Sequence, residues 1–136
     1  MSATLLLRIA AVIALLFAVG HTMGGQKDWS PQGENAVLQS MRTVPFEVMG
    51  NRRTYMDFYR GFGYALSVDQ VVTALVLFFL GGLAKTNPAA TRPFIAVLAL
   101  AQFAGAYIAW RYIIPIPAVL ALVLGIVLVA AFVRAR

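Results

Sequence analysis

Four long apolar stretches alternate with polar breaks along the chain, and one polar segment of real length, residues 26–60, separates the first stretch from the second. A helix needs ~20 residues to cross ~30 Å of hydrocarbon, and every stretch approaches or exceeds that length. None shows the alternation of a strand, and a helix satisfies its own backbone hydrogen bonds in lipid. We therefore predict four membrane-spanning helices. They are expected over residues 3–24, 61–84, 93–110 and 117–133.

The predicted fold class is all-α: a polytopic membrane protein whose spans form a four-helix bundle, in one membrane domain over residues 1–136. The chain is 61% hydrophobic and 12% charged, with a mean hydropathy of +0.81. A soluble domain is closer to half apolar and a quarter charged. The chain has no cysteine, which excludes disulfides, thiolate zinc sites and thiol catalysis.

The net charge of +6 would suggest a nucleic-acid partner in a soluble protein. Here the basic residues lie at the ends of the apolar stretches, where cations hold helix ends at lipid headgroups. We therefore predict membrane lipid as a partner and no nucleic acid. The basic residues at those ends are Arg8, Lys85, Arg92, Arg111, Arg134 and Arg136.

Four spans put both termini and the 85–92 connection on one side of the membrane. That side would hold five of the eleven basic residues, and the other side six, so the count alone does not orient the chain. The terminal side is almost free of acidic residues, whereas the long loop mixes both signs. We expect both termini to be cytoplasmic.

Small residues recur four positions apart in several spans, a spacing that lets helix backbones approach closely in a membrane. Alanine is also common in apolar helices, so any single pair could be incidental. Because spans one and three carry rows of three, we expect them to pack against neighbours, either within the chain or in a homo-oligomer. The rows are Ala10, Ala14 and Ala18; Gly20 and Gly24; Ala101, Gly105 and Ala109; Ala121 and Gly125.

The long loop is expected to contain a short amphipathic helix at the membrane surface. Ser30 and Pro31 resemble a helix cap followed by proline in the first turn, and Pro45 would end the helix. An apolar stripe runs between them. It contains Ala36, Val37, Met41 and Val44, and the nearby aromatic residues that suit the interface are Trp29, Phe46, Tyr55, Phe58 and Tyr59.

Polar residues of separate spans are predicted to cluster on the loop side of the bundle. Asp69 lies eight residues beyond Gly61, or ~12 Å along a helix, and Gln102 lies eight residues before Trp110. His21 closes the first span. The other members of the expected cluster are Tyr64, Ser67, Gln70, Tyr107 and Arg111.

Asp69 is the main ionisable residue within a span. Such a residue costs ~2.5–3.5 kcal/mol on insertion scales, so it usually faces the bundle and has a partner. Asp69 could carry a proton or balance a ligand's charge. Alternatively, it hydrogen-bonds Gln102 or His21, or lies near water. A lone His21 could be a base, but it favours an interhelical hydrogen bond, and no metal site is predicted.

The run from Asn51 to Tyr64 carries the most information. If the second helix begins near Arg52, one face carries Asp57 with arginines one turn to either side. This cluster could latch the loop over the bundle, or it could bind the anionic head of an amphipathic ligand among aromatic residues. Gly61 and Gly63 would allow a close backbone approach or bend the helix. The expected face contains Arg53, Asp57, Arg60, Tyr64 and Ser67.

Three motifs together resemble a group of small bacterial four-span membrane proteins. They are the H-T-x-G-G sequence from His21, the W-x-P sequence from Trp29 and the R-T-Y-x-D-F-Y-x-G-F-G sequence from Arg53. This resemblance covers most of the chain and implies a bacterial inner-membrane location, but no activity. The general plan is also similar to the DoxX-like and emopamil-binding (EXPERA) four-span proteins. In the latter, acidic side chains in a bundle cavity move a proton on a sterol.

Three functions fit these observations, and we favour the binding of a lipid, quinone or isoprenoid-like molecule in the loop-side half of the bundle. The second is proton-transfer chemistry of the isomerase kind on a hydrophobic substrate, with Asp69, Asp57 and His21 as candidate catalytic groups. The third is a structural or accessory subunit. No motif predicts a cofactor. The predicted ligand-binding residues are Arg53, Asp57, Arg60, Tyr64, Asp69, Gln102 and Arg111.

Overall fold

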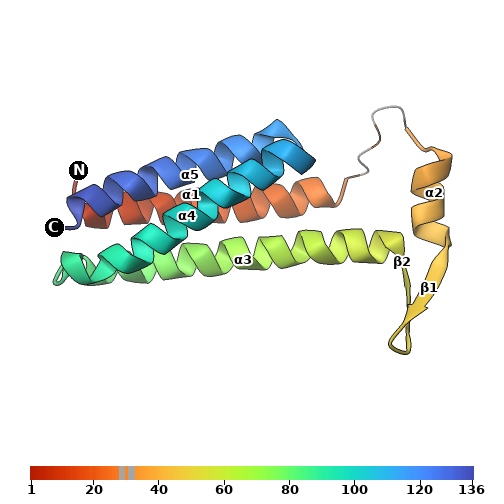
Figure 1. Ribbon diagram of the computed structural model, residues 1–136, viewed down its shortest axis with the longest axis horizontal. Coiled ribbons are helices and arrows are strands. Elements are labelled where there is room, and N and C mark those ends of the chain that lie inside the picture. Colours follow the sequence, from red (N-terminus) through yellow and green to blue (C-terminus); the bar gives the residue numbers. More distant parts are fainter. Residues whose placement is uncertain (28–29, 31–32) are drawn as a thin grey trace.

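The computed structural model describes residues 1–27, 30 and 33–136. Four long helices form a bundle, and a short helix and a two-stranded hairpin lie at one end of it (Figure 1). The four long helices are long and apolar enough to cross a membrane. The all-α prediction is confirmed, and the chain is an integral membrane protein. The elements are α1 (Ala3–Gly25), α2 (Ala36–Thr43), β1 (Pro45–Val48), β2 (Asn51–Thr54), α3 (Tyr55–Leu83), α4 (Pro88–Tyr112) and α5 (Pro115–Arg134).

Three of the four spans begin earlier than predicted, because a capping side chain fixes the start of α3 and of α4 and a proline fixes that of α5. The Thr54 side chain caps α3, which therefore begins six residues before Gly61. The Asn87 side chain accepts a hydrogen bond from the backbone of Ala90 at the start of α4, so Pro93 lies inside this helix instead of at its first position. Proline near the helix start also opens α5 at Pro115, because proline lacks the N–H that would be unpaired there.

Helix α3 is longer than the membrane requires. Its 29 residues span ~44 Å at 1.5 Å per residue, against ~30 Å of hydrocarbon. Its first turns extend beyond the end of α1 and carry α2 and the hairpin (Figure 1). The bundle therefore has two different ends: one with both chain termini, and one with the long loop (Figure 1).

Helix α1 is the central element of the bundle. It packs against both α3 and α5, and α4 packs chiefly against α5. Contacts between α3 and α4 are sparse, and the two helices diverge toward the loop end (Figure 1). Every long helix contributes to one apolar core cluster. Its fully buried large side chains are Leu7, Leu77, Ile95, Leu124 and Leu128.

The small-residue rows pack only in part as predicted. In α1 the alanine row from Ala10 to Ala18 is buried throughout, whereas Gly20 is exposed; the two small residues of α5, Ala121 and Gly125, are buried. In α4, however, Ala101 is exposed and a side chain at Gly105 would meet open space. The face that α4 buries shares only Ala109 with the predicted row. It carries Thr91, Ile95, Ala99, Gln102, Ala106 and Ala109.

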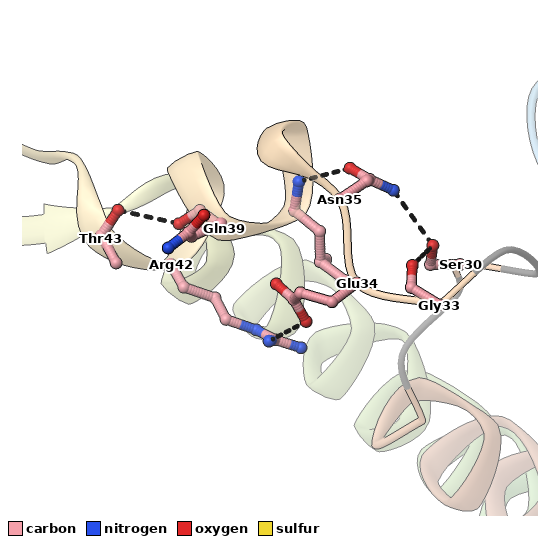
Figure 2. Close-up of polar contacts among 8 residues, drawn as sticks. Ser30, Gly33, Glu34, Asn35, Gln39, Arg42 and Thr43 are labelled. Carbon is pink, nitrogen blue, oxygen red and sulfur yellow. Dashed lines mark hydrogen bonds and ion pairs between the residues drawn. The ribbon is translucent and has the colours of Figure 1, made fainter.

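The amphipathic helix of the loop exists, but Ser30 does not cap it. The cap is Asn35, whose Oδ1 accepts the backbone N–H of Leu38 at 3.0 Å. Asn35 Nδ2 donates to Ser30 Oγ at 3.1 Å, and Ser30 Oγ bonds in turn to the carbonyl of Gly33, so Ser30 supports the cap from outside (Figure 2). An ion pair of 2.8 Å between Arg42 and Glu34 closes the same turn (Figure 2).

Helix α2 runs across the direction of the spanning helices (Figure 1), as a helix in the plane of the membrane surface would. Two residues of the predicted loop pattern, Trp29 and Pro31, lie outside the described residues.

The hairpin of β1 and β2 was not predicted. The strands pair antiparallel, with Pro45 opposite Thr54 and Val48 opposite Asn51. The two residues between them, Met49 and Gly50, have φ of 50° and 76°. Positive φ at both central positions defines the type I′ turn, which matches the twist of paired strands.

Candidate functional site

A shallow, open depression of about 370 Å³ lies where the hairpin runs into α3. Arg53 of β2 lies at one side of it, and the first three turns of α3 supply the rest. Its lining residues are Arg53, Asp57, Phe58, Gly61, Phe62 and Ala65. The depression therefore brings an arginine and an aspartate together with exposed aromatic rings, and nearly all of the surface that lines it is apolar.

Asp57 caps the helix instead of bridging two arginines. Its Oδ2 accepts the Thr54 N–H at 2.8 Å, while its own N–H donates to Thr54 Oγ1 at 3.2 Å. This reciprocal pair is a capping box, which satisfies free N–H groups at the start of a helix. Within the described residues Asp57 forms no ion pair with Arg53 or Arg60. An ion pair to Asp57 therefore does not hold this cluster together, and a latch over the bundle stays a prediction.

Only the first member of the predicted helical face, Arg53, is misplaced, because the other four lie in α3 at intervals of three and four residues. Arg53 belongs to β2, so the helix does not start near Arg52. Its Nη1 donates to the carbonyl of Arg52 at 2.8 Å. Asp57 lines the surface depression, whereas Ser67 is buried against α1. The face therefore runs from the surface at Asp57 to the contact with α1 at Ser67.

Aromatic contacts attach the hairpin to α3. The ring centroid of Phe46 in β1 lies 5.0 Å from that of Tyr55 and 5.2 Å from that of Phe58. Phe58 in turn lies 6.2 Å from Phe62. Because Phe58 and Phe62 also line the depression, this cluster fixes the position of the hairpin beside the depression.

A second polar region lies between α1 and α3, near the loop end. The Thr22 hydroxyl lies 2.8 Å from both the Ala18 carbonyl oxygen and Ser67 Oγ, and Ser67 Oγ donates to the Gly63 carbonyl at 3.2 Å. This pair of hydroxyls joins the two helices, as small polar residues do in membranes. Sequence analysis named Ser67 but overlooked Thr22, which follows His21 in the same polar break.

Two buried polar atoms in this region have no hydrogen-bond partner among the described residues: His21 Nε2 and Gln70 Oε1. The His21 ring packs edge-on against Phe17, with 6.3 Å between centroids. A side chain at Gly63 would lie 3.8 Å from His21 Nε2. Buried polar atoms are usually hydrogen-bonded. A water molecule or a polar group of a bound molecule can therefore hydrogen-bond to these two atoms.

The predicted cluster of His21, Asp69 and Gln102 does not form. Phe17 of α1 and Ala106 of α4 belong to one buried cluster, so these two residues lie at a similar height along the bundle. Gln102 lies one turn from Ala106 toward the termini, whereas His21 lies one turn from Phe17 toward the loop. Two turns separate these levels by ~11 Å along the bundle. Gln102 is buried, but it belongs to the deeper part of the core.

Asp69 lies on an exposed face of α3. Along the bundle axis Asp69 lies at nearly the same height as Thr22, because Thr22 hydrogen-bonds to Ser67, which is two residues earlier in α3. No hydrogen bond within the described residues joins Asp69 to His21 or Gln102. The expectation that Asp69 faces the bundle is therefore wrong. It shares a face with the depression, since Phe58, Phe62, Ala65 and Asp69 recur at intervals of four, three and four residues.

The other predicted site residues are dispersed. Arg60 and Tyr64 are exposed on α3 and lie outside the lining of the depression. Tyr107 and Arg111 are exposed on α4, where the Arg111 guanidinium lies 5.2 Å from the Tyr112 ring. Of the predicted ligand-binding residues, the structure brings only Arg53 and Asp57 into one site.

Of the lining residues, Ala65 escaped sequence analysis, and Gly61 and Phe62 were expected near the charged cluster but were not placed on one helical surface. Their spacing from Phe58 would have revealed them, because residues three and four apart are neighbours on a helix. No group of three or more His, Cys, Asp or Glu side chains that could hold a metal ion occurs in the described part of the chain.

Comparisons with known proteins give no match to a family model, to a curated protein or to a solved structure. The resemblances to four-span families stay predictions, and the functional argument rests on the site itself.

Proposed function

We propose that this membrane protein binds an amphipathic molecule of the lipid, quinone or isoprenoid class at the depression where the hairpin meets α3. The observation that carries the proposal is the lining of that depression. It brings Arg53 together with the exposed rings of Phe58 and Phe62 on one surface. A guanidinium suits an anionic or strongly polar head, because its fork of donors matches carboxylate and phosphate oxygens.

The shape of the surface suits a long ligand. From the depression, the same face of α3 continues through Ala65 to Asp69, one turn further into the membrane. The distance from Asp57 to Asp69 is twelve residues, or ~18 Å along the helix. A ligand with its head at Arg53 and its apolar body along Phe58 and Phe62 would reach Asp69 with any second polar group that it carries.

The proton-transfer alternative has less support. It requires a carboxyl group at a closed cavity, where water is excluded. Asp57 is exposed and occupied in capping α3, and Asp69 is also exposed. The depression that Asp57 lines is open.

An accessory role through helix packing is the second candidate, and one observation favours it. Ala101 is exposed on α4, and the position of a Cβ at Gly105, one turn away, is open. Another helix could approach closely there. Because the chain lacks cysteine, Ala101→Cys should form disulfide-linked dimers in membranes, whereas Ala99→Cys, which is buried, should not. Absence of the cross-link would count against a homo-oligomer through this face.

The binding proposal is tested by mass spectrometry of lipids that copurify with the full chain in mild detergent. Arg53→Gln should lower ligand retention about tenfold, because a hydrogen bond to a charged group contributes ~1.5–3 kcal/mol. Arg52→Gln is the matched control. It makes the same charge change on the neighbouring strand residue, which lies outside the depression. Equal retention by both variants and by the wild type would reject the site.

We further propose a bacterial inner-membrane location with both termini in the cytoplasm. The support is the distribution of charge, because all five acidic residues lie in the chain between α1 and the middle of α3, leaving the terminal end with cations alone. Single cysteines at Met49 and Arg136 would report the two sides. An impermeant maleimide added to spheroplasts should label the Met49→Cys variant only, and the reverse pattern would invert the orientation.

A further inference from the structure

Arg8 lies within the first membrane span, on the terminal side of the bundle and far from the proposed ligand site. Its guanidinium carbon lies 3.5 Å from the centroid of the Phe78 ring of α3. A side chain at Gly81 would come within 3.1 Å of Arg8 Nε, so the glycine leaves room for Arg8 to cross from α1 to α3. The side chain is partly buried.

The charge of Arg8 has no anionic partner within the described residues. Among those residues its guanidinium forms no ion pair and no hydrogen bond, and its one electrostatic contact is the cation–π contact with the Phe78 ring. A guanidinium has five N–H donors and no acceptor capacity. Within a span, an arginine usually pairs with an anion or a carbonyl group. The guanidinium of Arg8 is therefore left with donors that a bound molecule can satisfy.

The surface beside Arg8 indicates the kind of molecule that supplies the acceptor. A shallow hollow of about 270 Å³ is lined by Arg8, Ile9, Val12 and Ile13. Its lining apart from Arg8 is aliphatic, and it extends along α1 away from the chain terminus, toward the middle of the membrane. Only the aliphatic stem of Arg8 faces the hollow, because the guanidinium lies beside it on the Phe78 ring. The hollow itself therefore suits a hydrocarbon chain.

We propose that Arg8 and this hollow form a binding site for an anionic glycerophospholipid. The phosphate accepts hydrogen bonds from the guanidinium, in the bidentate geometry that arginine favours. One acyl chain lies along Ile9, Val12 and Ile13. Phe78 and Gly81 hold the guanidinium at the edge of the hollow. The site is independent of the depression at Arg53, which lies at the other end of the bundle.

The test is native mass spectrometry of the full chain, titrated with phosphatidylglycerol or with phosphatidylcholine of the same acyl chains. Wild type should retain phosphatidylglycerol at least tenfold better. Arg8→Gln should lose one bound phosphatidylglycerol, and Arg8→Lys should retain an intermediate amount, since lysine keeps the charge but not the fork. Arg136→Gln, with the same charge change at the terminal side, should bind as wild type does.

A second pair of variants keeps Arg8 and tests the hollow. Val12→Trp should fill it and displace the lipid, whereas Val19→Trp, another exposed valine of α1 outside the hollow, should not. Equal affinity for the two lipids, or retention of phosphatidylglycerol by both Arg8→Gln and Val12→Trp, would overturn the proposal. Arg53→Gln should leave phosphatidylglycerol bound at Arg8. This variant therefore distinguishes loss of the Arg8 site from loss of the ligand site at the depression.

Discussion

The ring of Phe46 in β1 lies 5.2 Å from the ring of Phe58 in α3, centroid to centroid, and so connects the hairpin to the helix that follows it. The ring of Tyr55, also in α3, lies 5.0 Å from the same Phe46 ring. Aromatic pairs of this kind contribute ~0.5–1.5 kcal/mol each beyond the area that they bury. The hairpin therefore depends on Phe46 for its position.

Phe46→Ala should release the hairpin without unfolding the spans, whose core lies elsewhere. Trypsin should then cleave after Arg52 and Arg53 roughly tenfold faster, because a loss of about 1.4 kcal/mol raises the open population by that factor. Val48→Ala, at an exposed position of the same strand, is the control and should be cleaved at the wild-type rate. Unchanged cleavage of the Phe46→Ala variant would show that the aromatic cluster does not hold the hairpin.

Two glycines on facing helices should respond in opposite ways to alanine. A Cβ at Gly125 in α5 would lie 2.9 Å from Cε1 of Phe103 in α4, whereas a Cβ at Gly105 meets nothing within 4 Å. Overpacking costs ~1–3 kcal/mol, which outweighs the gain of up to ~1 kcal/mol from replacing glycine in a helix. Gly125→Ala should therefore lower the melting temperature in detergent, and Gly105→Ala should raise it or leave it unchanged. A higher melting temperature for Gly125→Ala would contradict the packing of α4 on α5.

Asp69 should oppose stability and support binding. Its carboxyl group lies on an exposed face of a spanning helix, where a charge costs up to ~3 kcal/mol. Asp69→Leu should thus raise the stability of the ligand-free protein by at most that amount, while it lowers ligand retention. Thermal unfolding with and without copurified lipid separates the two effects. Glu47→Gln removes one negative charge from the exposed hairpin and should change stability by less than ~0.5 kcal/mol. A less stable, ligand-free Asp69→Leu variant would instead indicate that Asp69 has a structural partner.

The spans were predictable because length and hydropathy determine them, and helix α2 was predictable from its apolar stripe. The hairpin was missed although its signal is present: two four-residue runs flank Met49 and Gly50, and such a two-residue connection favours paired strands. Helix starts were misjudged where hydropathy, rather than the capping residues Thr54 and Asn87, was used to place them.

The site was predicted less well, for a geometric reason. Counting residues from the end of a span gives the depth of a side chain, but not the direction in which it points. Asp69 lies at nearly the level of Thr22, yet it occupies another face of α3 than Ser67. Direction depends on which helices are neighbours, and the sparse contact between α3 and α4 could not be read from hydropathy.

Gly61 gives the sharpest test of the depression, because nothing in the fold requires a glycine there. Its φ is not positive and a Cβ would meet no atom within 4 Å, so alanine should stabilise α3 by ~0.5–1 kcal/mol. Since Gly61 lines the depression, the added methyl group also narrows the site. Gly61→Ala should therefore gain stability and lose some ligand.

The larger variant Gly61→Trp should fill the depression and abolish retention while the helix stays folded, as circular dichroism in detergent would show. Gly20→Ala in α1 is the matched control, because its Cβ also meets open space but lies outside the depression. It should gain stability with no change in bound ligand. If Gly61→Trp retains the ligand as wild type does, the ligand lies elsewhere on the bundle, and Arg53 and Phe62 are then surface residues without a binding role.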